Sequence, residues 1–107
     1  MKVANRVKRY TEFQKVINEG SLVRANVLYG YFLKNDLGHT RFGISIPTKS
    51  GHAVHRNKMK RQIRAAIVSV CDYSKSYDII LIARKEFDVE SYEQTVADVE
   101  EIVRKVG

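Results

Sequence analysis

The amino-acid sequence predicts one α+β domain covering residues 1–107, with elements in the order α-β-β-β-α-β-α and a small sheet. Three observations indicate this fold class. The 107 residues, 44% of them hydrophobic, suffice for one core and are too few for two. Segments with helical periodicity alternate with β-branched and aromatic runs. We find neither internal repeats nor a Pro/Gly-rich linker, so we expect a two-layer sandwich of helices on a sheet.

Three segments carry apolar residues at helical spacing, and we expect helices over 11–19, 53–71 and 91–106. Thr11, with Gln14 three residues later, is predicted to cap the first helix, and Gly20 to end it. Ser91 or Asp88 is expected to cap the third helix. The predicted buried stripes are Phe13, Val16 and Ile17; then Met59, Ile63, Ala66, Ile67 and Val70; then Val96, Val99, Ile102, Val103 and Val106.

The predicted strands lie between these helices. Residues 21–35 are β-branched and aromatic and form one or two strands. Residues 41–46 alternate apolar and polar side chains, and Pro47 ends that strand. Residues 77–84 contain an unbroken apolar run, which favours a central strand covered on both faces.

The positive charge of the chain is concentrated in one third of its length. The net charge is +7, and residues 37–71 contain no Asp or Glu. That segment holds seven basic residues: Arg41, Lys49, Arg56, Lys58, Lys60, Arg61 and Arg64. Since the other 12 basic residues (19 − 7) match the 12 acids, the whole excess lies here. A local excess of this kind indicates a polyanionic partner, either nucleic acid or a membrane surface.

The start of the second predicted helix carries an ordered polar face. At about 100° per residue, its four cations and one amide fall within about 140° of the helix surface, beside the apolar stripe. They are Arg56, Asn57, Lys60, Arg61 and Arg64. Cations at a helix N-terminus oppose the helix dipole. A solvated face is the alternative, but such faces normally mix charge signs, so an anionic partner explains the pattern better.

Known nucleic-acid-binding motifs do not account for this helix. No second helix follows after a short turn, and no zinc-finger spacing or GXXG loop is present. His52 and His55 could form a metal or acid–base pair, but no acid lies nearby in sequence. Phosphate contact or surface exposure explains them better. The residues alone therefore indicate nucleic-acid binding, with RNA favoured, and a stand-alone nuclease or a general RNA-binding or ribosome-associated protein stays open.

Tyr29, Tyr31 and Leu33 share one face of their predicted strand by alternation. An aromatic platform beside basic residues is typical of single-strand binding, but the residues alone favour a core position for Phe13, Tyr31 and Phe32.

The remaining composition bounds the setting of the protein. No 18-residue apolar run is present, and the first ten residues lack a secretory h-region. The single cysteine, Cys71, follows an apolar run and is best explained as a small core residue. We therefore expect a cytoplasmic protein in a reducing compartment.

Three stretches resemble the bacterial ribonuclease P protein component family. They are "RFGISIPTKSGHAVHRNKMKRQIR" (41–64), "RVKRYTEFQKVINEG" (6–20) and "YDIILIARK" (77–85), in the same order as in the family. The resemblance implies the ribosomal protein S5 domain 2-like fold, with a left-handed βαβ crossover that is exceptional.

The resemblance also implies a function. The protein would be a subunit of the holoenzyme that cuts the 5′ leader from precursor tRNA, and it would bind both the catalytic RNA subunit and precursor tRNA. It implies no catalytic residue, metal or cofactor in the protein, because magnesium held by the RNA would do the chemistry. Neither a membrane nor an obligate protein partner is expected.

Carried over by motif position, the resemblance assigns two sets of residues. Contacts to the RNA subunit would be Lys49, Gly51, His52, Arg56, Asn57, Lys60, Arg61 and Arg64. Contacts to the leader, in a cleft between the first helix and the sheet, would be Phe13, Ile17 and Tyr31. Four positions depart from the family pattern. His52 replaces an Asn, Thr48 replaces a Lys, Ala65 stands where an acid is frequent, and Ile17 lacks the aromatic ring found in many members.

Overall fold

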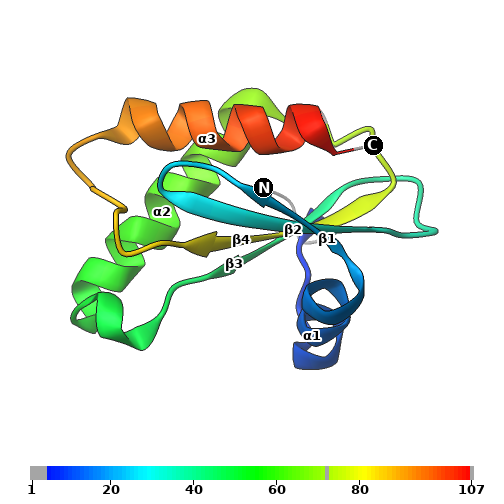
Figure 1. Cartoon of the computed structure of the whole chain (residues 1–107), viewed down its shortest axis with the longest axis horizontal. Helices are drawn as coiled ribbons and strands as arrows, with labels where there is room; N and C mark the ends of the chain where they lie inside the picture. The colour runs from blue at the N-terminus through cyan, green and yellow to red at the C-terminus, as the bar shows by residue number, and fades with distance from the viewer. Residues whose placement is uncertain (1–4, 72, 107) are drawn as a thin grey trace.

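The computed structural model describes residues 5–71 and 73–106, and its helices and strands follow the predicted order (Figure 1). The helices are α1 (Tyr10–Glu19), α2 (Ala53–Val70) and α3 (Tyr92–Lys105). A short 3-10 helix, Thr48–Ser50, precedes α2. The strands are β1 (Ser21–Arg24), β2 (Leu28–Lys34), β3 (Arg41–Ser45) and β4 (Tyr77–Ala83).

The four strands form one mixed sheet in the order β1-β2-β4-β3. Strand β4 is antiparallel to β2 and parallel to β3, so it is the central strand that its apolar run predicted. Helix α2 connects the parallel pair and completes a βαβ unit. The left-handed sense of this crossover stays a prediction.

Helices lie on both faces of the sheet (Figure 1). Helices α2 and α3 pack on one face and α1 on the other, and alternate side chains of β4 serve the two sides. Ile79 and Leu81 belong to the cluster with α2 and α3, whereas Ile80 packs with Val16 of α1. The predicted two-layer sandwich is therefore the sheet with α2 and α3, and α1 adds partial cover to the opposite face.

The start of α1 differs from the sequence prediction. Thr11 does not cap the helix, because Arg9 occupies the N-cap position and Glu12 the third helical position. The Arg9 backbone N–H donates to Oε1 of Glu12 at 3.3 Å. The prediction from local sequence chose Thr11 as the cap. It could not include the second partner of Glu12, Arg41, which is distant in the sequence. Gly20 ends the helix as predicted, with its N–H donating to the Val16 carbonyl at 2.8 Å.

The turn between β1 and β2 is held by a buried carboxylate on α3. Oδ2 of Asp98 accepts hydrogen bonds from the backbone N–H groups of Val27, at 2.6 Å, and Leu28, at 3.2 Å. Asp98 is only 1% exposed, so these bonds replace the water that its charge would otherwise need. Strand β1 is thereby fixed against α3.

The segment before α1 extends the sheet beyond β3. Arg6 forms a parallel bridge with Phe42, and the Val7 N–H donates to the Phe42 carbonyl at 2.9 Å. This pairing places the Arg6 side chain at the β3 edge, next to α2.

No helix among the described residues is long and apolar enough to cross a membrane.

Candidate nucleic-acid interface

The predicted polar face of α2 is open to solvent. Asn57, Arg61 and Arg64 are exposed, and Arg56 and Lys60 are half-exposed. The apolar stripe on the adjoining face is buried as predicted, with Ile63 at 0% exposure, and it fixes the rotation of the helix. The first turn of α2 contains no acid and no side-chain cap. The unpaired N–H groups at this end carry partial positive charge, and the basic side chains add to it, so this end of α2 is electropositive.

Arg56 has a second role that the sequence did not indicate. Its Nη1 donates to the Gly51 carbonyl at 2.6 Å and lies 3.4 Å from the Thr48 carbonyl. One guanidinium nitrogen thus holds the loop before α2, and the other N–H groups remain directed away from those carbonyls. Arg56 therefore orders the loop as well as presenting charge.

The predicted interface also includes three residues of the loop held by Arg56: Lys49, Gly51 and His52. Gly51 has a φ of 139°, a conformation that side-chain-bearing residues rarely adopt, so this position needs glycine. His52 is exposed at the N-cap of α2, and its carbonyl accepts the first helical hydrogen bond, from Arg56 N–H at 2.9 Å. Lys49 is exposed and lines a cavity between the loop and β4.

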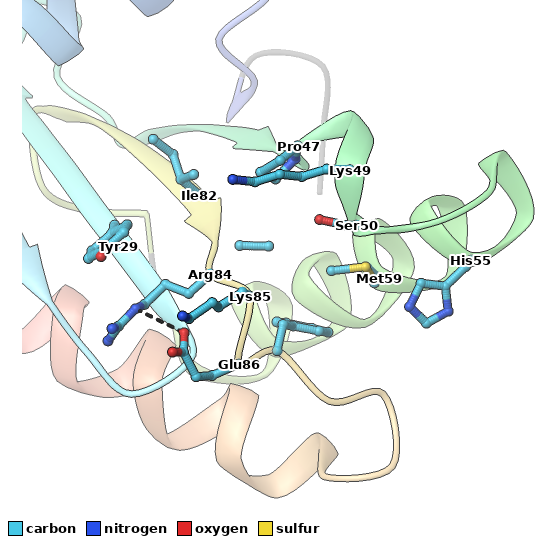
Figure 2. A pocket seen from close by; sticks show the side chains of 12 residues that line it. Tyr29, Pro47, Lys49, Ser50, His55, Met59, Ile82, Arg84, Lys85 and Glu86 are labelled. Carbon is cyan, nitrogen blue, oxygen red and sulfur yellow. Dashed lines mark ion pairs between the residues drawn. The ribbon is translucent and has the colours of Figure 1, made fainter.

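That cavity has a volume of about 590 Å³ and lies beyond the ends of β3 and β4 (Figure 2). Lys49 enters it from the loop, and Arg84 and Lys85 from the segment after β4 (Figure 2). The Arg84 guanidinium lies 4.8 Å from the centre of the Tyr29 ring, within cation–π range. Its Nε is also 3.5 Å from Oε1 of Glu86. The cavity combines the rings of Tyr29 and Phe87, apolar walls, three cations and the Glu86 carboxylate. Its excess of cations over acids beside aromatic rings suits a base and its phosphate.

A smaller cavity, of about 150 Å³, joins two parts of the site that sequence reasoning kept separate. Lys60 and Arg64 of α2 line it together with Phe13 of α1 and Arg6. Its floor includes Phe42, Gly43 and Ile44 of β3. The basic helix and the first helix therefore meet across the β3 edge.

The other two predicted leader residues lie apart from this junction. Tyr31 is half-buried in the cluster under α1, so the core interpretation accounts for part of its surface. Ile17 is half-buried on α1 and lines neither of these two cavities. Tyr29 shares the face of Tyr31 as the alternation predicted, and unlike Tyr31 it lines the larger cavity.

One cation of the basic segment is not available to a ligand. Arg41 donates from Nε and Nη2 to the two carboxylate oxygens of Asp78 at 2.8 and 2.6 Å, and from Nη1 to Glu12 at 3.1 Å. The hydrogen bonds to Asp78, more than the opposing desolvation, raise the pKa of Arg41 above its ordinary value. Desolvation alone would raise the pKa of Glu12, but the Arg9 N–H and Arg41 lower it below 4.5.

Sequence reasoning missed the residues that complete the two cavities, chiefly Arg6, Tyr29 and Arg84. The signals were available, since Arg84 lies within the stretch 77–85 and Tyr29 alternates with Tyr31. Among residues 5–71 and 73–106, no group of three His, Cys, Asp or Glu side chains could hold a metal ion, and this includes the surroundings of His52 and His55.

An α+β domain with an exposed cationic helix face beside aromatic cavities defines a nucleic-acid-binding protein. Comparison with known proteins identifies which one. The family model described as Ribonuclease P matches residues 1–107, so the chain belongs to the ribonuclease P family. It is 38% identical over 105 residues to the ribonuclease P protein component of Mesoplasma florum, covering 96% of each chain.

Two solved structures agree with this family. The RNase P protein of Staphylococcus aureus is 31% identical, with a TM-score of 0.80 over 94% of this chain and 93% of that one. The RNase P protein of Thermotoga maritima, 24% identical, supports the fold with a TM-score of 0.82 over 95% and 100% of the two chains. The family makes the chain a subunit of the ribonuclease P holoenzyme, which cleaves precursor tRNA, and a partner of ribonuclease P RNA.

Proposed function

We propose that this protein binds the RNA subunit of ribonuclease P through α2 and the loop before it, and holds the 5′ leader of precursor tRNA on the α1 side of the sheet. The single observation that carries the proposal is the smaller cavity. There Lys60 and Arg64 of the basic helix meet Phe13 of α1 across β3. A chain bound to one helix is therefore within reach of the other.

The contacts to the RNA subunit follow from exposure and charge. Arg61 and Asn57 project from the exposed face of α2, and His52 and Lys49 from the loop. Phosphates at this position relieve the repulsion between the cations and the positive end of the helix dipole. Arg56 supports the same interface by holding the Gly51 carbonyl.

The leader is proposed to lie over the aromatic side chains on the α1 side. Phe13, Tyr31 and, less directly, Ile17 form the part beside α1. Each base stacked on an aromatic ring contributes about 1–3 kcal/mol, without strong sequence preference. This suits a leader whose sequence differs from one tRNA to the next.

In this proposal the protein supplies binding and no catalytic group. The exposed face is cationic, so it repels Mg²⁺ and attracts the phosphates that would hold Mg²⁺ in the RNA. We propose accordingly that magnesium belongs to the RNA part of the holoenzyme, and that the protein acts in the cytoplasm without an obligate protein partner.

The deciding experiment incubates precursor tRNA with the protein, with the cognate RNA subunit, and with both, in low magnesium. Cleavage is expected with RNA and protein together, and little or none with either alone. Cleavage by the protein alone would reassign the chemistry to protein groups such as His52 and His55. If the protein gave no gain over the RNA, a general RNA-binding role would be favoured.

The Tyr31→Ala variant tests the leader site. It should lower holoenzyme affinity for precursor tRNA about fivefold or more and leave affinity for mature tRNA unchanged, because only the precursor has bases to stack. Affinities for both RNAs are measured by equilibrium binding. An equal loss for both would count against stacking on Tyr31.

A further inference from the structure

Helix α1 is held to the sheet by few apolar contacts. Val16 is its one buried residue, and Phe13 is only partly buried. The cluster under α1 has three buried members, Val7, Val16 and Ile80. Apolar packing of this extent leaves the position of α1 dependent on its other contacts.

An ion-pair network supplies such a contact at the N-terminal end of α1. Arg41 of β3 lies between Glu12 of α1, at 3.1 Å, and Asp78 of β4, at 2.6 Å. The side chains of Arg41 and Asp78 are 16% and 11% exposed, so the pair is shielded from solvent. Asn35 donates to Oδ1 of Asp78 at 2.8 Å and fixes that carboxylate further. Arg41 is therefore a rigid support to which Glu12 binds.

Glu12 is the immediate neighbour of Phe13, which forms part of the smaller cavity. The Phe13 ring lies directly over β3: a Cβ placed on Gly43 would come within 2.5 Å of Phe13 Cζ. Arg41 and Gly43 are two residues apart on β3 and so face the same side. Glu12 and Phe13 thus rest side by side on the same edge strand.

We infer that Glu12 is a positioning residue for leader binding: through Arg41 and Asp78 it fixes α1 so that Phe13 keeps its place in the smaller cavity. The inference rests on the proposed leader site and adds to it a residue that touches no RNA. It predicts that a carboxylate facing the sheet, and not the RNA, controls the preference of the holoenzyme for precursor over mature tRNA.

Removing Glu12 should affect this preference without unfolding the protein. Arg41 keeps both hydrogen bonds to Asp78 in a Glu12→Ala variant, so no buried charge is left unpaired. Alanine also suits a helix better than glutamate. The variant also loses the oxygen that accepts the Arg9 N–H, so the loss should be confined to the first turn and the orientation of α1.

The experiment measures affinities of the reconstituted holoenzyme for precursor and mature tRNA, and of the protein for its RNA subunit. Glu12→Ala is expected to lower precursor affinity about threefold to tenfold, with the other two affinities unchanged. Glu12→Gln, which keeps an acceptor for Arg41 and loses the charge, should give a smaller loss. Glu19→Ala is the matched control, because Glu19 is an exposed acid at the other end of α1. It should behave as wild type.

A double-mutant cycle with Arg41→Lys tests the route of the effect. Lysine keeps the charge but has one nitrogen, which cannot serve both carboxylates. The losses from Glu12→Ala and Arg41→Lys should not add if they remove one shared contact. Additive losses, or unchanged discrimination in Glu12→Ala, would overturn the positioning role. A wild-type holoenzyme with no preference for precursor tRNA would overturn the proposed leader site as well.

Discussion

On the side of α2 and α3, the cluster formed by the sheet and these helices contains thirteen buried apolar residues among those described, whereas the cluster on the α1 face contains three. The first face is closed by two helices, and its side chains are fixed on all sides. The second is covered by one short helix held by Val16, Phe13 and an ion pair. The two faces therefore differ in role. The face under α2 and α3 supplies most of the folding stability, and the face under α1 keeps aromatic and cationic side chains accessible to a ligand.

Adjacent isoleucines of β4 give the strongest test of this difference. Ile79 and Ile80 are both 0% exposed but point to opposite faces. Ile79→Ala should lower the free energy of unfolding by about 3–5 kcal/mol, because the closed core cannot collapse around the cavity. Ile80→Ala should cost about 2–3 kcal/mol, because α1 can settle inward. Urea unfolding of both variants measures the difference, and equal losses would contradict it.

Two glycines sharpen the same comparison by adding a methyl group. A Cβ on Gly30 would lie 2.6 Å from Ile102 Cγ2 in the closed core, and one on Gly43 would lie 2.5 Å from Phe13 Cζ. Gly30→Ala should therefore cost about 2–3 kcal/mol of folding stability. Gly43→Ala should cost about 1–2 kcal/mol, because the Phe13 ring can swing away although the buried Ile80 Cδ1, 2.7 Å from the added methyl, must also shift. Thermal unfolding checks the order. Precursor tRNA affinity should fall only for Gly43→Ala.

Two arginines on the polar face of α2 differ in role, because Arg56 also holds the loop before the helix and Arg61 does not. Arg61→Ala should flatten the salt dependence of RNA-subunit binding by about one unit of slope, as expected for one lost phosphate contact. Arg56→Ala should do the same and weaken binding further, since the loop carbonyls of Gly51 and Thr48 lose their donor. Binding measured across a salt series separates the two effects. Unchanged slopes would remove both residues from the interface.

The smallest expected effect is a pH dependence at α1. The pKa of Glu12 is lower in the folded protein than its ordinary 4.5, so the folded state favours the charged form. Its contribution to stability is present above that ordinary value and is lost as pH falls through the folded pKa. The stability difference between wild type and Glu12→Gln should therefore shrink as the pH falls below 4.5. A constant difference would show that neither the Arg9 N–H nor Arg41 stabilises the Glu12 carboxylate.

Local patterns predicted the elements of this fold well. The stripes of α2 and α3 are buried where their spacing placed them, and the apolar run of β4 became the central strand. Contacts between distant residues could not be predicted in this way. The Glu12–Arg41 pair spans 29 positions. Arg41 was counted in the basic excess of residues 37–71, although it pairs with two acids.

For the candidate site, as for the fold, the sequence predicted the local features and did not predict which distant residues come together. Exposure of Asn57, Arg61 and Arg64 followed from helical geometry alone. The convergence of Phe13 with Lys60 and Arg64 did not, because it depends on how two helices meet across β3. Nor could the loop contact of Arg56 be anticipated, since it requires the φ of 139° at Gly51.

The place of β4 in the sheet also bears on how the chain is made. Strands β2 and β3 pair on either side of β4, yet β4 follows them in the sequence. During synthesis from the N-terminus, neither strand has this neighbour until residues 77–83 emerge. Helix α1 precedes all four strands in the sequence, yet it rests on Ile80 of β4 and must wait for it. The earliest-made wall of the leader site is thus among the last parts to dock, and its cationic neighbour α2 is already complete by then.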